Sequence, residues 1–162
     1  MLRFISVRSA IALAACLVSL ILVNVSIAGK ERLLRDGKVV YLELAPVDPR
    51  SLMQGDYMAL RFRLAESVPA RSAVADGHVV AALDARGIAS YRRLHDGKPM
   101  ESSEVLLRYR LRNGQLKFAT NAFFFEEGTG ARYEQARYGE FRVASDGELL
   151  LTGLRGKDLR KL

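Results

Sequence analysis

Acidic side chains are the first residues in this sequence that could do chemistry. Glu126 and Glu127 follow the apolar stretch AFFF, and Glu140 and Asp56 complete the set. Two carboxylates across a cleft could act as general acid and base, with one pKa raised by apolar surroundings. Adjacent strand residues face opposite sides, however, so Glu126 and Glu127 cannot both enter one site unless the strand has ended before them. We expect structural pairing with nearby arginines instead, namely Arg132, Arg137 and Arg142.

Other catalytic or metal-binding patterns are weaker. Ser51, in RSLMQGDY, invites comparison with membrane-bound Ser/Lys peptidases, but the two lysines that could serve as base, Lys98 and Lys117, lie in a turn and on a polar strand face. His78 and His95 stand beside glycine-containing turns without metal-ligand spacing or a cysteine partner. The sequence therefore predicts a protein that is not an enzyme and has no metal or cofactor.

Tyrosines and arginines are the better functional candidates, because both residue types anchor binding surfaces. Tyr133 and Tyr138 are five residues apart, about 140° around a helix, so at least one should pack inward. The residues we predict to contact a partner are Arg50, Asp56, Tyr57, Arg132, Tyr133 and Tyr138.

The stretch APVDPRSLMQGDYMALRF, residues 45–62, has the residues of a corner between two strands. Asp48 and Pro49 fit an N-cap followed by the first position of a single helical turn, and Gly55 can end that turn. Leu60 and Phe62 then belong to the core face of the next strand. The residues of this stretch that these structural roles do not explain, and that are therefore candidates for a functional role, are Arg50, Asp56 and Tyr57.

Alternating hydrophobicity predicts that the remaining elements are mostly strands. The strands are expected at 40–44 and 58–64, hairpins at Asp84–Gly87, Asn113–Gly114 and Ser145–Gly147, and a short apolar strand in NAFFFEE. Residues 64–78 read as a long loop. The segment GTGARYEQARYG predicts the one helix outside the N-terminal segment, about two turns long, beginning after Thr129 and ending at Gly139. The expected fold is mainly β: a small antiparallel barrel or sandwich with one short helix, preceded by a transmembrane helix.

The N-terminus carries the clearest signal. Residues 9–28 form a run of 20 residues without a charge, long enough to cross a bilayer as a helix. We therefore expect a short basic tail at 1–8, a transmembrane signal anchor at 9–28 and a soluble β-rich domain at 29–162. A cleaved signal peptide ending in SIA, or a lipoprotein modified at Cys16, are alternatives.

Charge bears on orientation and on partners. The chain has a net charge of +7, and removal of Arg3 and Arg8 leaves 23 basic against 18 acidic residues, or +5. A basic start, apolar core and small-residue end favour a single-pass protein of the inner (cytoplasmic) membrane with its domain outside the cytoplasm. The basic residues that follow the apolar run favour the opposite orientation.

One strand has a basic outer face, formed by Arg108, Arg110 and Arg112 and continued by Lys117 across the hairpin. No aromatic residue shares that face to stack bases, so nucleic acid is not an expected partner. Docking on anionic lipid is an alternative use.

The segment GDYMALRF, residues 55–62, resembles the signature of the bacterial GDYXXLXY family, with Phe62 in place of the final tyrosine. LELAPVDPRSLMQGDYMALRF and FFFEEGTGARYEQARYGEFRVASDGELLLTGL are similar to two characteristic blocks of that family. The resemblance implies a membrane-anchored domain associated with a multi-pass membrane protein, and it supplies no cofactor or catalytic residue. We therefore expect a non-catalytic β-domain that binds or supports an integral membrane partner, with an envelope hydrolase as the alternative.

Overall fold

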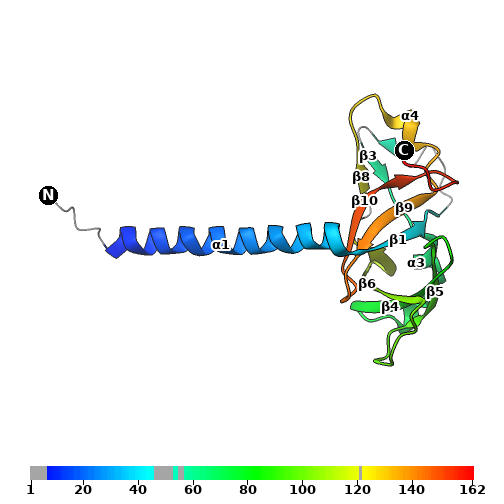
Figure 1. The fold of residues 1–162 in the computed structure, drawn as a ribbon, viewed down its shortest axis with the longest axis horizontal. Helices are drawn as coiled ribbons and strands as arrows, with labels where there is room; N and C mark the ends of the chain where they lie inside the picture. The colour runs from blue at the N-terminus through cyan, green and yellow to red at the C-terminus, as the bar shows by residue number, and fades with distance from the viewer. Residues whose placement is uncertain (1–6, 46–52, 55–56, 121) are drawn as a thin grey trace.

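The computed structural model describes residues 7–45, 53–54, 57–120 and 122–162. Its longest element is helix α1 (Val7–Asp36), which projects from one side of a β-domain (Figure 1). Most of α1 is exposed, and Leu33 is its one buried residue among those described. One helix is therefore long and apolar enough to cross a membrane, as the sequence predicted.

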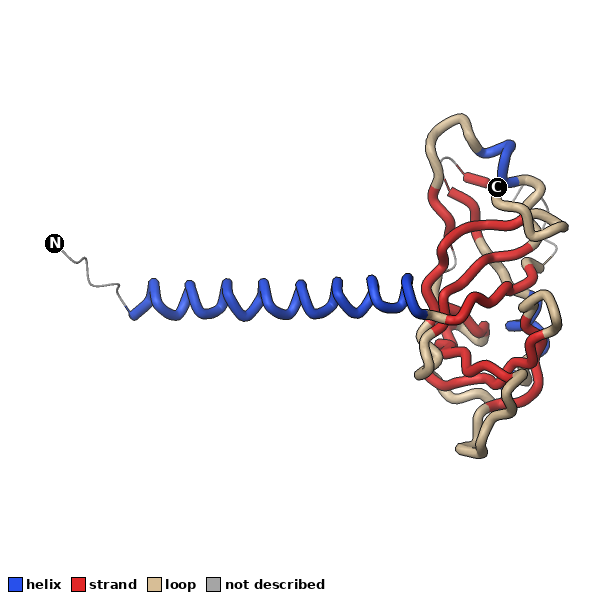
Figure 2. The backbone as a smooth tube through the Cα atoms, viewed as in Figure 1, coloured by secondary structure: helices blue, strands red, loops and turns tan. Residues whose placement is uncertain are grey.

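The domain is mainly β, in agreement with the predicted class (Figure 2). One antiparallel sheet has the order β1 (Lys38–Glu43), β9 (Tyr138–Val143), β10 (Leu149–Arg155). A second has the order β5 (Ala89–Leu94), β4 (Asp76–Leu83), β6 (Glu104–Arg112), β7 (Gln115–Phe118). A third, small sheet has the order β2 (Met53–Gln54), β3 (Tyr57–Ala59), β8 (Ala122–Phe124).

The sheets curve around one core as an open half-barrel (Figure 1). A parallel bridge between Tyr41 and Ile88 joins the first sheet to the second, and a bridge between Leu44 and Phe62 joins the first sheet to the chain after β3. The largest fully buried side chains come from both major sheets and include Tyr109, Phe118 and Phe141. Burial of these faces drives the fold, at roughly 25 cal/mol for each Å² of apolar surface.

The three predicted hairpins are confirmed. β4 and β5 meet at Asp84, whose carboxylate accepts hydrogen bonds from the amides of Arg86 and Ile88. β6 and β7 meet at Asn113 and Gly114, whose φ angles of 52° and 72° are those that a type I′ turn requires. β9 and β10 are joined through residues 144–148, with a Gly147 φ of 85°.

The second strand and the loop after it were wrongly predicted. The second strand ends early: β3 stops at Ala59, and a one-turn helix, α3 (Arg63–Ser67), begins after Phe62. The alternation through Leu64 nevertheless identified buried residues, because the first turn of α3 keeps Leu64 directed at the core. The predicted loop 64–78 thus contains α3, a 3₁₀ turn (Ala70–Ser72) and the start of β4.

The helix predicted in GTGARYEQARYG is only one turn long. α4 spans Gly130–Tyr133, and the Thr129 hydroxyl donates to the Glu126 carbonyl at 2.6 Å instead of capping the helix. Gly139 does not end a helix, because it lies inside β9. Pairing of β9 with β1 and β10 on both sides outweighs the weak helical preference of this segment.

Candidate functional site

The two blocks of sequence that resemble the GDYXXLXY family meet in the small sheet. Tyr57, from the first block, lies directly opposite Phe124, from the second. Their ring centroids are 5.8 Å apart, within the range of a stabilising aromatic pair. Phe124 is nevertheless 74% exposed. An aromatic side chain is therefore held in solvent beside the signature tyrosine.

Tyr133 extends this arrangement inward. Its ring lies 5.1 Å from the Phe123 ring and 5.1 Å from the Phe125 ring, so α4 packs against the side of β8 that faces away from Phe124. This contact agrees with the prediction that at least one of the two candidate tyrosines packs inward. We call the set the aromatic end of the domain, and its members are Tyr57, Phe123, Phe124, Phe125 and Tyr133.

The structure separates the remaining described candidates. Arg132 precedes Tyr133 in α4 and is exposed, so it borders the aromatic end. Tyr138 is half-buried in β9, between Glu43 of β1 and Arg155 of β10, and so belongs to a different sheet. The fold brings Tyr57, Arg132 and Tyr133 to one region, whereas Tyr138 lies apart from them in the sheet of β1, β9 and β10.

Most of the proposed corner lies outside the described residues. This applies to two candidate contacts, Arg50 and Asp56, and to the residues assigned to the helical turn, Asp48, Pro49 and Gly55. Ser51 lies there as well. Met53–Gln54, the described part of the corner, forms strand β2 and pairs with β3, so the prediction of one helical turn that continues to Gly55 was wrong there. The rest of the corner stays a sequence-based prediction.

The core assignments within the signature are confirmed. Leu60 and Phe62 are each 4% exposed, and the Phe62 ring forms an edge-to-face pair with Phe141 at 5.4 Å. Gly139 lies against the same two rings, since a Cβ there would fall 2.9 Å from Phe141 and 3.0 Å from Phe62. The signature strand is therefore packed on β9, in the second block.

Among the candidate carboxylates, Glu140 has the structural pairing that we expected, but with a different arginine. Nε of Arg155 donates to Oε2 of Glu140 at 2.6 Å, and the Thr152 hydroxyl donates to the same carboxylate at 3.0 Å. The prediction that Glu140 pairs with Arg132, Arg137 or Arg142 was wrong, because the β9–β10 register places Arg155 nearer to it. Glu126 and Glu127 are exposed just after β8, and Glu140 is already occupied by its arginine.

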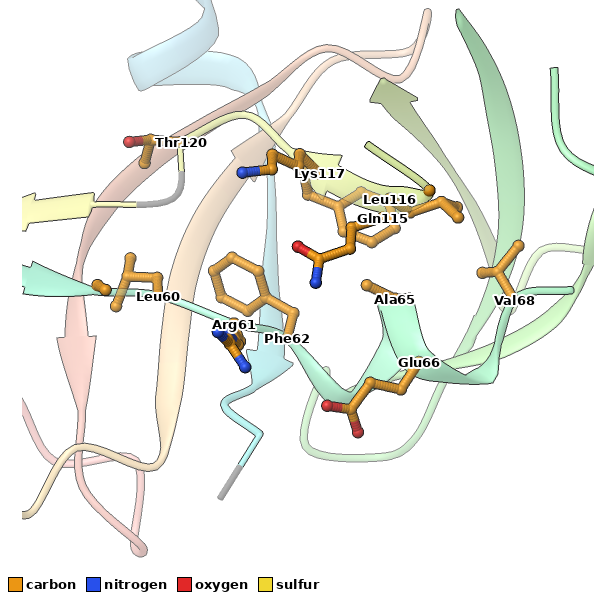
Figure 3. Close-up of a pocket in the computed structure, with 13 residues that line it drawn as sticks. Leu60, Arg61, Phe62, Ala65, Glu66, Val68, Gln115, Leu116, Lys117 and Thr120 are labelled. Atoms are coloured by element: carbon orange, nitrogen blue, oxygen red, sulfur yellow. The ribbon is translucent and has the colours of Figure 1, made fainter. Parts of the chain in front are cut away.

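A pocket of about 420 Å³ opens beside the end of the signature strand (Figure 3). Residues 59–62 line one wall, α3 a second and β7 a third. The Gln115 amide points between Phe62 and Ala65 (Figure 3), and the lining also includes Arg61 and Glu66, both exposed. An amide with charges of both signs can bind and orient a polar group, and the pocket lining as described offers no serine, cysteine or histidine.

A second pocket, of about 570 Å³, lies beside α1. Its charged lining is mostly basic: Lys30, Arg108, Arg110 and Lys117 come from α1, β6 and β7, and Glu148 is the one acidic residue among them. Arg110 and Lys117 are directly opposite in the β6–β7 register, which confirms that the basic face continues across the hairpin. Phe124 and Leu149–Leu151 supply the apolar part of the lining.

Histidines and other possible metal ligands do not converge in the described parts of the chain. The His78 and His95 rings are 6.5 Å apart and edge to face, but no group of three or more His, Cys, Asp or Glu residues is gathered among the described residues. A hydrogen bond from Arg35 lowers the pKa of Asp36, and a hydrogen bond from Lys98 lowers the pKa of Asp96. Both acids are surface groups outside the two pockets.

Sequence reasoning missed Phe124 as a candidate. The stretch AFFF reads as a continuously apolar, buried strand, yet successive strand residues face opposite sides. The middle one of the three phenylalanines therefore faces the side opposite to the other two. This alternation could have predicted that Phe124 is exposed. Lys30 and Glu148 were missed because they are 118 residues apart, and no local pattern connects them.

Comparison with known proteins agrees with the resemblance seen in the sequence. No curated protein and no solved structure matches the chain. The sequence model of one family, described as GDYXXLXY protein, matches residues 19–154. The matched region includes the second half of α1 and almost the whole β-domain, with both signature blocks. The chain therefore belongs to the GDYXXLXY family.

Proposed function

We propose that this protein is a non-catalytic, membrane-anchored domain that binds an integral membrane protein through its aromatic end. In this proposal α1 is an uncleaved signal anchor of the inner membrane, and the β-domain lies on the extracytoplasmic side. The supporting observation is the exposure of Phe124, 74%, beside the signature Tyr57. Exposed aromatic residues next to an arginine are typical of the anchors of protein interfaces.

The position of the aromatic end supports a partner inside the membrane. β3 and β8 lie at the edge of the domain from which α1 leaves (Figure 1). Phe124 also shares a pocket lining with Lys30, two residues after the apolar run of α1. A protein embedded in the same bilayer could reach this edge, whereas it would not reach the opposite side of the domain.

The enzyme alternative has less support. It needs two carboxylates free to act across a cleft, for which Asp56 and Glu126 or Glu127 were the predicted pair. Asp56 lies outside the described residues, and the further candidate Glu140 is held by Arg155 and Thr152. Glu126 and Glu127 are exposed next to α4 and outside both pockets. Burial or a neighbouring carboxylate would be needed to prepare either group for acid catalysis.

Site-specific photocrosslinking in intact membranes tests the proposed surface. A photoreactive phenylalanine analogue replaces Arg132, and the matched control carries it at Arg92, an exposed residue of β5. We expect one integral membrane protein to crosslink from 132 and not from 92, and the crosslink to disappear with Tyr57→Ala and Phe124→Ala. Equal crosslinking from both positions, or an unchanged crosslink in the double variant, would contradict the proposal.

Retention of the anchor needs a separate measurement. We expect the intact 18.0 kDa chain to remain in the membrane after an alkaline wash, and a reporter fused at residue 162 to be active only outside the cytoplasm. A chain shortened by the first 28 residues would identify a cleaved signal peptide instead.

A further inference from the structure

The basic pocket beside α1 lies in the gap between the two major sheets, where β10 faces the β6–β7 hairpin. We call this gap the seam of the half-barrel. At the start of the seam the amide of Arg108 donates to the carbonyl of Gly147 at 2.8 Å, so β6 touches the β9–β10 hairpin there. Farther along, β10 pairs only with β9 among the described strands, and β6 continues to β7. The pocket occupies the space between β10 and the β6–β7 hairpin, with β8 on its far side.

The position of α1 determines the level of this pocket relative to the bilayer. The apolar run ends at Ala28, and Lys30 is two residues beyond it, or ~3 Å along a helix. The head-group layer of each leaflet is roughly 5–8 Å thick. Lys30 forms an ion pair with Glu148, which lines the same pocket, so this part of the domain reaches the head-group level when α1 crosses a bilayer.

The charges in the pocket are unbalanced. Arg108 and Arg110 are exposed on one face of β6, and neither has an acidic partner in the part of the chain that the structure describes. Glu148 is engaged by Lys30, and the Asp76 carboxylate is 3.6 Å from Arg112. The lining carries four basic residues against one acidic residue, a net charge of +3.

The apolar side of the pocket is formed by residues of β8 and β10. Phe124 projects from β8 with 74% of its surface exposed, and Leu150 and Leu151 of β10 are half-buried. A cationic wall next to an apolar wall suits a ligand with an anionic head and an apolar tail. A volume of about 570 Å³ is within the usual range for small-molecule sites.

We propose that this pocket binds the head group of an anionic glycerophospholipid. The phosphate lies between Arg108, Arg110 and Lys117, because guanidinium groups present paired donors to phosphate oxygens. The upper part of the acyl chains passes Phe124 toward the bilayer. This inference depends on α1 crossing the membrane but not on a protein partner, so the two proposals can fail separately.

A tryptophan at position 124 provides the probe, since the chain contains no other tryptophan. The full-length Phe124→Trp protein is reconstituted in phosphatidylcholine vesicles with about a tenth of phosphatidylglycerol. Bromine, which quenches tryptophan fluorescence, is placed on the acyl chains of either the phosphatidylglycerol or an equal amount of the phosphatidylcholine. We expect brominated phosphatidylglycerol to quench more strongly, because the pocket concentrates it near residue 124.

Charge variants separate the pocket from general attraction to the surface. Arg108→Gln with Arg110→Gln removes two charges from the lining, and Arg92→Gln with Arg160→Gln removes two exposed charges elsewhere. Each basic residue near an anionic surface contributes a factor of about five in affinity. We expect the pocket variant to lose about tenfold or more of the preference for phosphatidylglycerol, and the control variant to keep it.

Three outcomes would overturn the proposal. The first is equal quenching by the two brominated lipids. The second is an equal loss in the pocket and control variants, which would indicate diffuse electrostatics only. The third is displacement of phosphatidylglycerol by an equal concentration of glycerol phosphate, which would assign the pocket to a soluble anion. All four substituted arginines are exposed, and equal thermal unfolding midpoints will verify that the variants are folded.

Discussion

The Phe62 ring occupies the space that a side chain at residue 139 would need. A Cβ placed on Gly139 would be 3.0 Å from Cε1 of Phe62 and 2.9 Å from Cε2 of Phe141. Phe62 is the last residue of the signature, and Gly139 lies in the second block, 77 positions later. The absence of a side chain at 139 thus lets the two blocks pack directly on each other.

Gly139→Ala should destabilise the domain by about 1–3 kcal/mol, because two buried rings cannot move aside for the new methyl group. Chemical unfolding of the full-length protein in detergent measures the change. Gly153→Ala in β10 is the matched control, since a Cβ there meets nothing within 4 Å. An equal loss in both variants would show that the close contact with the rings is not the cause.

The edge-to-face pair of Phe62 and Phe141 should couple energetically. A double-mutant cycle with Phe62→Leu and Phe141→Leu is expected to give a coupling energy of about 0.5–1.5 kcal/mol, because leucine keeps most of the apolar volume but not the ring geometry. The cycle uses unfolding free energies of the wild type, both single variants and the double variant. Strict additivity would contradict a specific interaction between the rings.

Arg155→Met should destabilise the domain by about 1–3 kcal/mol, because it leaves the Glu140 carboxylate without its cation in a site where only 14% of that side chain is exposed. Lys98→Met is the control: Lys98 pairs with Asp96 at 2.8 Å, but its side chain is 75% exposed. Exposed pairs contribute little, so this change should stay within about 0.5 kcal/mol. Unfolding by urea distinguishes the two, and similar losses would argue against a structural role for Glu140.

The junction between α1 and the β-domain should depend on Gly37. A Cβ there would fall 2.5 Å from the carbonyl oxygen of Leu33 and 3.1 Å from Cβ of Arg142, whose guanidinium donates to the Gly37 carbonyl at 3.0 Å. Gly37→Ala should therefore loosen the junction and speed cleavage by trypsin at nearby Lys38. Limited proteolysis followed by mass spectrometry measures the rate.

Gly29→Ala is the control for the junction. A Cβ at Gly29 meets nothing within 4 Å, and alanine is better than glycine inside a helix by about 1 kcal/mol at most. Trypsin should cleave this variant no faster than the wild type. Faster cleavage in both variants would mean that α1 itself, and not the packing at Gly37, controls access.

Local patterns in the sequence were sufficient for most of the elements. The uncharged run at 9–28 determined the long apolar helix, since each backbone group of a helix bonds within the segment. Alternation identified buried positions such as Val40, Leu42, Leu60 and Phe62, and Asn113–Gly114 determined a hairpin, because few other residues accept positive φ. These are short-range effects, so neighbouring residues carry the information.

Pairing between distant strands decided the rest. The segment after Thr129 has only a weak helical preference, and β9 forms from much of it because β1 and β10 supply hydrogen bonds on both sides. The same long-range pairing selected Arg155 as the partner of Glu140, exposed Phe124 beside Tyr57 and brought Lys30 to Glu148. The sequence by itself determined an apolar helix and a set of half-buried strands. Only the tertiary structure decided which side chains gather in the seam beside α1, because that arrangement depends on contacts between residues far apart in the chain.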